Sequence, residues 1–478
     1  MDVMPLPTYN SAATSAVPQA SRADGTGAIH AKEVPVNWKV PSLVLALPLS
    51  VCLGTQPPQA APSIKIGSTT VIKESLDANA ESQLKAASNL SKFTLEDATD
   101  ADLAKLCALF PGMTELKVAK GKRITNLAPL AGLKNLKRLE LRDCQAPDLT
   151  PVAGLSGLTS INVDSTMADL AWMEKLTNLT NLSVSSKALV SLKGLPSLPN
   201  LRQASINMGK PDDLTPIVES LPNLRTLKLH YITAPADLSP LTRLAQMEDL
   251  DFYGATVKDF SVLAGCPKLK KLTYYATKGA DYSTLGKLTQ VEELFGGLSG
   301  LKDIAWIVNL PGLKKFTLFA EPIVDYTPLA QTKLEYLKIW SMKAPVDLTP
   351  VGKIATLKEL VFWSVEQASG SKALAGLTAL EKLTVNDFNK QKGGENFDLS
   401  AASGWKKLKE LSMQATAVDN FAALASCAAL ERVSLTRMKV DSLAPLKKLP
   451  ALKSVRVTKG SFPDAELQGF APSVKVSQ

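Results

Sequence analysis

Three segments repeat one pattern and decide the fold: Leu313-Lys-Lys-Phe-Thr-Leu-Phe319, Leu334-Glu-Tyr-Leu-Lys-Ile-Trp340 and Leu357-Lys-Glu-Leu-Val-Phe-Trp363. Each follows the pattern L-x-x-L-x-L, with Phe316, Ile339 or Phe362 in place of one leucine, and an aromatic residue follows at the seventh position. The starts are 21 and 23 residues apart, which is the spacing of a structural repeat. Working outward from these segments, the same pattern recurs along most of the chain.

The pattern starts seventeen times. Successive starts are 21 to 23 residues apart, except for 28 residues between Leu380 and Leu408. The repeats take up most of the 478 residues, so we expect no separate catalytic domain among them. The starts are Leu90, Met113, Leu136, Leu158, Leu179, Leu201, Leu224, Met247, Leu269, Val291, Leu313, Leu334, Leu357, Leu380, Leu408, Leu430 and Leu452.

The pattern itself predicts strands that stack in parallel. Its fourth and sixth positions are two residues apart, so they share one face of a strand, and the third, fifth and seventh positions face the other way. One strand cannot bury two leucines alone, but neighbours stacked about 4.8 Å apart bury them as a continuous column. We therefore expect a quasi-one-dimensional array of repeats whose ends need caps.

This repeat resembles the leucine-rich repeat family, in its short 22-residue class of internalins and SDS22-like proteins. The resemblance covers roughly residues 90 to 476 and implies an α/β solenoid, a right-handed superhelix or horseshoe. A parallel sheet would line its concave face, with turns or 3-10 segments on the convex side. The family usually places an Asn where this chain has Cys144, Thr166, Lys187, Gly209, Ile232, Ala255, Met342 or Thr416, so the regular Asn ladder is absent.

The domain organisation follows from the repeat boundaries. We expect an N-terminal cap at 62–89, repeats at 90–460 and a C-terminal cap at 461–478. The first 34 residues are interpreted as a disordered leader or a mis-assigned start, and residues 35–61 as a signal peptide or lipoprotein leader.

An apolar run at residues 41–54 bears on the compartment. It is too short to span a bilayer and suits the core of a signal peptide, so we expect export. Two forms of export are open, because Leu49-Ser50-Val51-Cys52 is similar to a bacterial lipobox that would lipidate Cys52, whereas cleavage nearer residue 62 would release a soluble protein.

An aromatic stripe is the strongest functional signal. Only 6% of the chain is aromatic, yet six of seven consecutive repeats carry a ring at the seventh position, and none of the other ten does. We call these seven positions the aromatic stripe: His230, Tyr253, Tyr275, Gly297, Phe319, Trp340 and Trp363. Tyr231, Phe295 and Tyr336 would add area beside it.

Three interpretations of the aromatic stripe are open. Stacked rings could serve only to stabilise the sheet. Exposed aromatic residues more often mark interaction sites, and they dominate protein interfaces, so a protein or peptide partner is preferred. Aromatic platforms also stack sugars, which keeps a carbohydrate ligand as an alternative. The polar segment Asn389 to Asn396, an insertion in the 28-residue repeat, is either a tolerated loop or a side wall for the ligand.

The third position of the repeats alternates in charge. It runs Asp249, Lys271, Glu293, Lys315 and, beyond Tyr336, continues from Glu359 to Arg432. In an in-register parallel stack each charge lies beside opposite charges on the neighbouring strands. We therefore interpret these residues as a structural ion-pair ladder, and Asp249 as a partner of Lys271 rather than half of a catalytic pair.

The search for chemistry is negative. The chain has two histidines, His30 and His230, too few for a His-based metal site or a catalytic triad. No phosphate-binding, dinucleotide-binding or nucleophile-elbow motif occurs, so we expect no catalytic residues, no metal and no cofactor.

The net charge of +9 is spread along the chain, which favours solvated faces over a nucleic-acid footprint. Cys107, Cys144, Cys266 and Cys427 are expected to be small buried residues without disulfides.

These observations lead to one functional hypothesis and two alternatives. We expect an exported, non-enzymatic, monomeric protein of a bacterial envelope that binds a protein or peptide through its concave aromatic stripe. The resemblance to internalins implies adhesion or host contact. The alternatives are an intracellular scaffold of the SDS22-like sort and a carbohydrate-binding envelope protein; a membrane would be reached only through a lipid anchor.

Overall fold

The computed structural model describes residues 64–208, 213–230, 235–254, 256–277, 279–297, 300–389 and 395–478. The expected leader segments, the lipidation candidate Cys52, the stripe neighbour Tyr231 and positions 390–394 of the insertion lie outside the described residues. All elements below belong to residues 61–478, one of the two units into which the chain divides.

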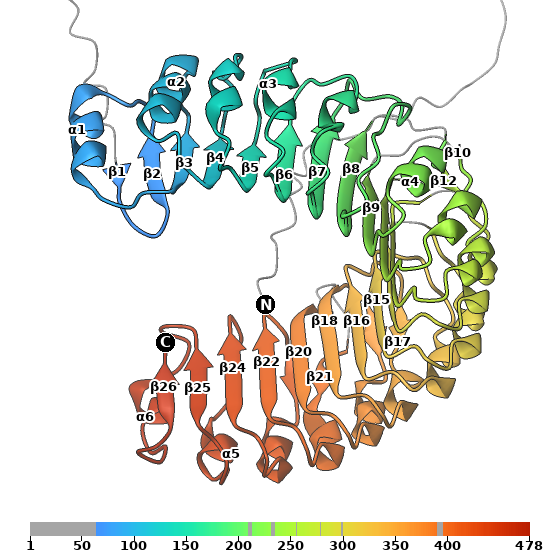
Figure 1. The fold of residues 1–478 in the computed structure, drawn as a ribbon. Helices are drawn as coiled ribbons and strands as arrows, with labels where there is room; N and C mark the ends of the chain where they lie inside the picture. The colour runs from blue at the N-terminus through green and yellow to red at the C-terminus, as the bar shows by residue number, and fades with distance from the viewer. Residues whose placement is uncertain are drawn as a thin grey trace, which may run out of the picture. The chain divides into compact units, whose positions relative to one another are not determined.

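Twenty strands form one sheet along the inner side of a curved stack (Figure 1). Apart from the first, each pairs in parallel with its neighbours, and the repeat positions align residue for residue. The strands are β1 (Ile64–Lys65), β2 (Thr70–Lys73), β3 (Lys92–Glu96), β4 (Glu115–Ala119), β5 (Arg138–Leu141), β6 (Ser160–Asp164), β7 (Asn181–Ser186), β8 (Gln203–Met208), β9 (Thr226–His230), β11 (Asp249–Tyr253), β13 (Lys271–Tyr275), β14 (Glu293–Gly297), β15 (Lys315–Phe319), β16 (Tyr336–Trp340), β18 (Glu359–Val365), β20 (Lys382–Phe388), β22 (Glu410–Gln414), β24 (Arg432–Thr436), β25 (Ser454–Val457) and β26 (Lys475–Ser477).

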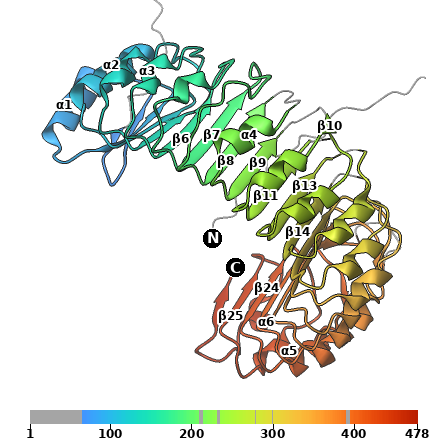
Figure 2. The same cartoon turned by 45° about the vertical axis from the view of Figure 1, so that its right-hand side comes forward.

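The return half of most repeats forms a short helix or 3-10 turn on the outer side (Figure 2). The helices are α1 (Ala78–Ala86), α2 (Asp100–Leu109), α3 (Thr150–Ala153), α4 (Thr215–Ser220), α5 (Ala444–Lys447) and α6 (Asp464–Leu467). The 3-10 turns are η1 (Ala128–Gly132), η2 (Ala171–Met173), η3 (Ser239–Arg243), η4 (Ser261–Gly265), η5 (Tyr282–Lys287), η6 (Ala305–Asn309), η7 (Thr327–Gln331), η8 (Val351–Lys353), η9 (Ser371–Gly376), η10 (Leu399–Gly404) and η11 (Phe421–Ser426). Three two-stranded ribbons lie between them: β10 (Pro235–Ala236) with β12 (Thr256–Val257), β17 (Val346–Asp347) with β19 (Ala368–Ser369), and β21 (Phe397–Asp398) with β23 (Val418–Asp419).

The alternation of buried and exposed residues follows the sequence pattern. In β15, Phe316 and Leu318 are fully buried, whereas Lys315, Thr317 and Phe319 face the concave side. The prediction that the seventh position looks into the hollow is therefore confirmed. The next residue commonly takes a positive φ, as at Ala320, Ser341 and Ser364, and this turns the chain away from the sheet. The seventh position consequently lies at or close to the carboxyl end of each strand; β18, for example, runs two residues beyond Trp363, to Val365.

Both ends of the sheet extend beyond the counted repeats. At the start, β1 pairs antiparallel with β2, and β2 already pairs in parallel with β3. At the other end, β26 pairs in parallel with β25. The parallel stack therefore has one more strand at each end than the L-x-x-L-x-L pattern shows, because those end strands lack the full leucine set.

A row of aspartates caps the start of the turn segments. In ten repeats an Asp carboxylate accepts the backbone N–H two residues further on, at 2.6–3.0 Å, where the turn segment begins. This local bond satisfies a donor that the turn would leave unpaired. The aspartates are Asp148, Asp169, Asp213, Asp237, Asp259, Asp281, Asp303, Asp325, Asp347 and Asp398.

The four cysteines of the repeats are buried and unpaired in the described part of the chain. Burial raises the pKa of the Cys266 and Cys427 thiols to about 11, which keeps them protonated and unreactive. The interpretation of these residues as small buried hydrophobic groups is confirmed.

The aromatic enrichment is only partly a surface feature. Sixteen of the 27 Phe, Tyr and Trp residues lie between positions 224 and 379, and seven of the sixteen are buried. The buried ones are Phe252, Phe260, Tyr274, Trp306, Phe316, Tyr326 and Phe362. The number of rings in this region therefore overstates how many are exposed, because the same repeats also use rings in place of leucines in the core.

Candidate binding surface

The aromatic stripe is assembled by strand pairing. Tyr253 is in register with His230 and with Tyr275, and Trp340 is in register with Phe319 and with Trp363. His230, Tyr253, Tyr275, Phe319 and Trp340 are half-buried, and Trp363 is 43% exposed. The structure thus brings together six of the residues predicted as a binding site, in one row from β9 to β18.

The rings contact each other along the row. Tyr253 and Tyr275 are nearly parallel, with centroids 4.9 Å apart, and the Phe319 and Trp340 centroids are 4.3 Å apart. Tyr275 and Phe319 belong to strands on either side of β14, yet their nearly parallel rings have centroids only 5.5 Å apart. Gly297 lies between them and has no side chain, so the two rings lean together above it. The position that breaks the aromatic pattern in the sequence therefore makes the stacking continuous.

Gly297→Ala tests this packing. A Cβ at position 297 would lie 2.8 Å from Phe319 Cβ and 2.9 Å from Phe319 Cδ1, so Phe319, including its backbone, must shift and its contact with Tyr275 is disturbed. We expect a loss of about 1–3 kcal/mol in the free energy of unfolding, the usual cost of overpacking, and a reduced near-ultraviolet dichroism of the aromatic side chains. Gly132→Ala is the control, since no atom lies within 4 Å of its added Cβ. Equal unfolding free energies for the two variants would contradict the proposed ring contact.

The stacking decides which part of each ring meets a ligand. Strands are about 4.8 Å apart, and the Tyr253 and Tyr275 rings are separated by nearly that distance with an interplanar angle of 12°. Their planes therefore stand across the row and cover one another, and ring edges point into the hollow. Sugars and nucleobases stack on ring faces, so the middle of the aromatic stripe is poorly suited to them. Edges with phenol groups suit the mixed apolar and polar surface of a polypeptide.

The predicted neighbours Phe295 and Tyr336 lie on the same face. The Phe295 ring centroid is 6.2 Å from that of Tyr275. Tyr336 is the first residue of β16 and the third of its repeat, and burial raises its pKa to about 12, so its phenol stays protonated. Both residues line a hollow of about 380 Å³ together with Lys271, Glu293, Leu294, Lys315, Thr317 and Glu359.

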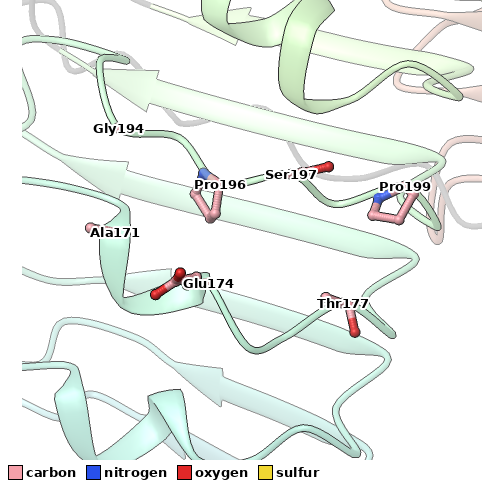
Figure 3. A pocket seen from close by; sticks show the side chains of 7 residues that line it. All are labelled: Ala171, Glu174, Thr177, Gly194, Pro196, Ser197 and Pro199. Carbon is pink, nitrogen blue, oxygen red and sulfur yellow. The ribbon is translucent and has the colours of Figure 1, made fainter.

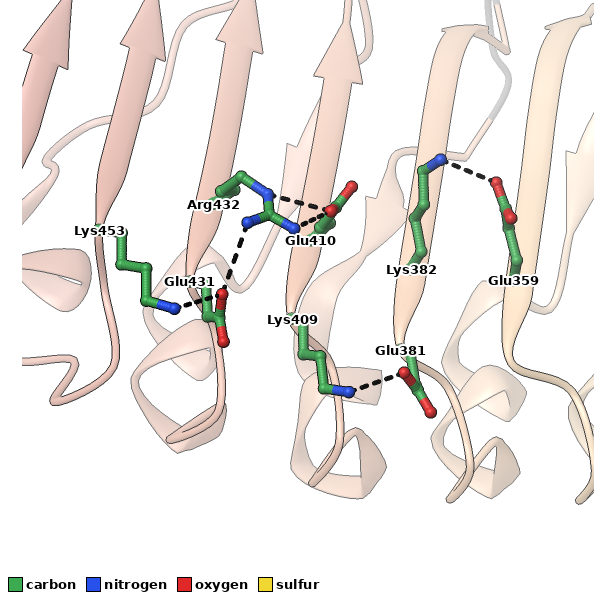
Figure 4. Close-up of polar contacts among 8 residues, drawn as sticks. All are labelled: Glu359, Glu381, Lys382, Lys409, Glu410, Glu431, Arg432 and Lys453. Atoms are coloured by element: carbon green, nitrogen blue, oxygen red, sulfur yellow. Dashed lines mark hydrogen bonds and ion pairs between the residues drawn. The ribbon is translucent and has the colours of Figure 1, made fainter. Parts of the chain in front are cut away.

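The ion-pair ladder predicted at the third position is confirmed. Lys271 Nζ lies 3.1 Å from Asp249 Oδ2, and Lys315 Nζ lies 2.5 Å from Glu293 Oε1. Further pairs are Lys92–Glu115, Lys382–Glu359 and Arg432–Glu410, the last two drawn in Figure 4. Asp249 therefore pairs with Lys271, as expected. Asp251 has its own contact, with His230 Nε2 3.8 Å from its Oδ1.

A second ladder at the preceding position was missed by the sequence analysis. Glu292 pairs with Lys270 and Lys314, each at 2.8 Å, and the same alternation continues to Lys453 (Figure 4). Its signal was present in the sequence as the run Glu248, Lys270, Glu292, Lys314, Glu335, Lys358, Glu381, Lys409, Glu431, Lys453. The two ladders pair acidic and basic side chains at the amino-terminal ends of these strands.

The second ladder predicts a pH dependence of stability. Hydrogen bonds and charge from Lys270 and Lys314 lower the pKa of Glu292 to about 2 in the folded protein. The unfolded value is higher, so this stabilisation is complete above about pH 4.5 and is lost as the pH falls towards 2. We expect the free energy of unfolding of Glu292→Gln to fall less steeply between pH 5 and pH 2 than that of the wild type. Urea unfolding across that range measures it, and identical slopes would contradict the pairing.

A second hollow and the remaining ionisable side chains offer no site. A hollow of about 550 Å³ lies between η2 and residues 194–199, and Figure 3 shows only scattered side chains around it, among which Glu174 is the single ionisable group. Among the described residues no three His, Cys, Asp or Glu side chains are grouped so that they could hold a metal ion. Within the same residues no helix is long and apolar enough to cross a membrane.

The geometry defines the class of protein. One parallel strand per 21–23 residues, an in-register leucine core and short outer turns are the features of a leucine-rich repeat solenoid. The chain has the leucine-rich repeat fold with short repeats, as its sequence pattern predicted.

Comparisons with known proteins agree with this fold. No protein-family model and no curated protein sequence matches the chain. Mouse RP105, solved in a complex with MD-1, has a TM-score of 0.57 at 14% identity over 85% of this chain and 78% of its own. An internalin of Listeria monocytogenes, InlF, has a TM-score of 0.44 at 21% identity over 66% and 84% of the two chains. A leucine-rich repeat protein of Leptospira interrogans, LIC12759, has a TM-score of 0.48 at 18% identity over 84% and 92%. At 14% identity, the likeness to RP105 shows the fold alone.

Proposed function

We propose that this protein is a non-enzymatic binding protein whose aromatic stripe holds an extended segment of a protein partner. The observation that carries the proposal is the row of six rings in one register on a concave face. Seven strands spaced about 4.8 Å apart make the row roughly 30 Å long, which is the length of about nine extended residues.

The arrangement of the rings favours a polypeptide over a carbohydrate. Tyr253, Tyr275 and Phe319 cover each other's faces and leave edges for contact. At the amino-terminal end of the same strands, the ladders are internally paired and leave little net charge to attract a polyanion. Mouse RP105, which shares the fold, holds a protein partner in its solved complex with MD-1.

The test uses defined probes rather than a lysate. The immobilised full chain is presented with a displayed library of random nonapeptides and, in parallel, with a glycan array. We expect the chain to select peptides, and the Trp340→Ala Trp363→Ala variant to lose them. If the chain binds glycans but selects no peptides, the carbohydrate alternative replaces this proposal. If the double variant still binds the selected peptides, the binding site lies elsewhere.

We further propose that the protein is exported, on the strength of the apolar run at residues 41–54 and its likeness to a signal-peptide core. We propose adhesion or host contact as the role of the exported protein. N-terminal sequencing and mass measurement of native material test the export. A start near residue 62 or a lipid-modified Cys52 supports it, and an intact Met1 supports the intracellular scaffold instead.

A further inference from the structure

Lys338 occupies an unusual place on the concave face. It lies in the middle of β16, two residues before Trp340, and its side chain points to the same side as the aromatic stripe. Its register neighbours are Thr317 on β15 and Val361 on β18, both uncharged. Val361 is only 8% exposed, so the surroundings of Lys338 are partly dry.

The ammonium group of Lys338 contacts two indole rings. Its Nζ lies 4.4 Å from the Trp340 ring centroid and 5.7 Å from that of Trp363. The side chain is half-buried, and this burial lowers its pKa. No ion pair joins Lys338 to a carboxylate anywhere in the described part of the chain. The two rings hold the ammonium in place, but they do not neutralise it.

The neighbouring concave charges are compensated. Lys271 pairs with Asp249, Lys315 pairs with Glu293, and Lys382 pairs with Glu359. Lys228, in the same row of the sheet as Lys338, is in register with Asp251. Beside the aromatic stripe, Lys338 is therefore a positive charge that forms no ion pair with any described residue.

We propose that the segment bound by the aromatic stripe is acidic, with an Asp or Glu carboxylate that pairs with Lys338 Nζ while flanking apolar side chains lie against Trp340 and Trp363. This inference rests on the proposed function and adds the chemistry of the partner. A hydrogen bond to a charged group is stronger than a neutral one, and it gains further where water is partly excluded. The two indoles pre-organise the ammonium, which reduces the ordering cost of binding.

A single carboxylate fits this place better than a phosphate group. One ammonium flanked by Thr317 and Val361 offers one charge, whereas phosphate recognition usually gathers several cationic or backbone donors. The ladder carboxylates Glu293 and Glu359 line the adjoining hollow and already hold Lys315 and Lys382 in ion pairs, so these lysines are not free cations for a dianion. An acidic side chain within an extended apolar segment brings one negative charge to the one ammonium group and apolar surface to the indoles.

The experiment compares peptide selection by charge variants of the full chain. A displayed library of random nonapeptides, with constant linkers at both ends so that no free carboxyl terminus is present, is selected on wild type, Lys338→Arg, Lys338→Met and Lys338→Glu. Arg456→Glu is the matched control, because Arg456 is an exposed cation in the same row of the sheet but on β25, outside the aromatic stripe. Folding of each variant is checked by circular dichroism.

We expect peptides selected by the wild type to carry Asp or Glu at one position flanked by apolar residues. Their affinity should fall about tenfold or more in Lys338→Glu, which reflects the size of a charged hydrogen bond. Lys338→Met should also weaken the binding of these peptides, whereas Lys338→Arg should largely retain it. Arg456→Glu should leave the affinity within about twofold of wild type. Lys338→Glu should select Lys or Arg at the same position of the peptide.

Other outcomes separate this inference from the proposed function. If wild type selects peptides without an acidic preference, or if Lys338→Glu binds them equally well while Trp340→Ala Trp363→Ala does not, the aromatic stripe remains the binding site and the acidic partner is wrong. If folded wild type selects no peptides at all, both proposals are wrong.

Discussion

Replacing Trp340 and Trp363 together by alanine is expected to weaken the binding of selected peptides by more than about 2 kcal/mol, roughly thirtyfold, while the solenoid stays folded. Trp363 is 43% exposed, and Trp340 is half-buried beside it. Large, partly exposed indoles dominate the energetics of protein interfaces because each removes much apolar surface from water on binding. The double variant also removes the two rings that position Lys338.

The fold should survive because neither indole belongs to the leucine core. Trp340 and Trp363 lie on the concave face, while Ile339 and Phe362, their neighbours in sequence, are fully buried on the other. The double variant gives up the ring pair with Phe319 and the two cation–π interactions with Lys338. Such pairs contribute about 0.5–1.5 kcal/mol each, which is small for a solenoid of this length.

Calorimetry with a selected peptide and urea unfolding of the same preparations measure the two effects separately. Gln414→Ala Thr436→Ala is the matched control, since both residues occupy the seventh position of repeats outside the aromatic stripe. A double variant that no longer folds would support the alternative in which the rings only stabilise the sheet. Unchanged affinity in a folded variant would remove Trp340 and Trp363 from the site.

The sequence predicted those features of the fold that depend on the repeat period and on the register of neighbouring strands. The leucine positions fix which face of each strand is buried, and the alternation of Asp249, Lys271, Glu293 and Lys315 fixes how neighbouring strands align. From these two signals the concave position of Tyr253 or Trp340 follows without coordinates. The aromatic stripe was therefore predicted residue by residue, except for its neighbour Tyr231, which the structure does not describe.

The sequence could not predict what depends on side-chain orientation. Gly297 looks like a gap in the pattern, and only the ring positions show that Tyr275 and Phe319 close over it. The contact of Lys338 with two indoles likewise depends on rotamers that a repeat pattern does not encode. The aspartate row is different, because the recurring Asp-Leu-Thr-Pro of Asp148 and Asp347 was visible and its capping role follows from turn chemistry.

Phe362→Ala should have the largest effect on stability of any change beside the aromatic stripe. Phe362 is fully buried on β18, and its ring centroid lies 5.7 Å from that of Phe388 and 6.4 Å from that of Phe397. Truncation leaves a cavity between repeats that stacked strands cannot close, which costs about 3–5 kcal/mol in the free energy of unfolding. Because each repeat is stabilised mainly by its neighbours, we expect the unfolding transition to split or broaden at this point of the array.

Trp363→Ala, one residue further along the same strand, is the control, because the two variants differ mainly in which face of the sheet loses a ring. We expect its free energy of unfolding to stay within about 1 kcal/mol of wild type, the range of a surface cation–π interaction. Phe362→Ala should lower peptide affinity only to the extent that the protein unfolds, whereas Trp363→Ala should lower affinity in the folded protein. If Trp363→Ala destabilised the chain as much as Phe362→Ala, the indole would have to belong to the core, and the concave binding surface would be wrong.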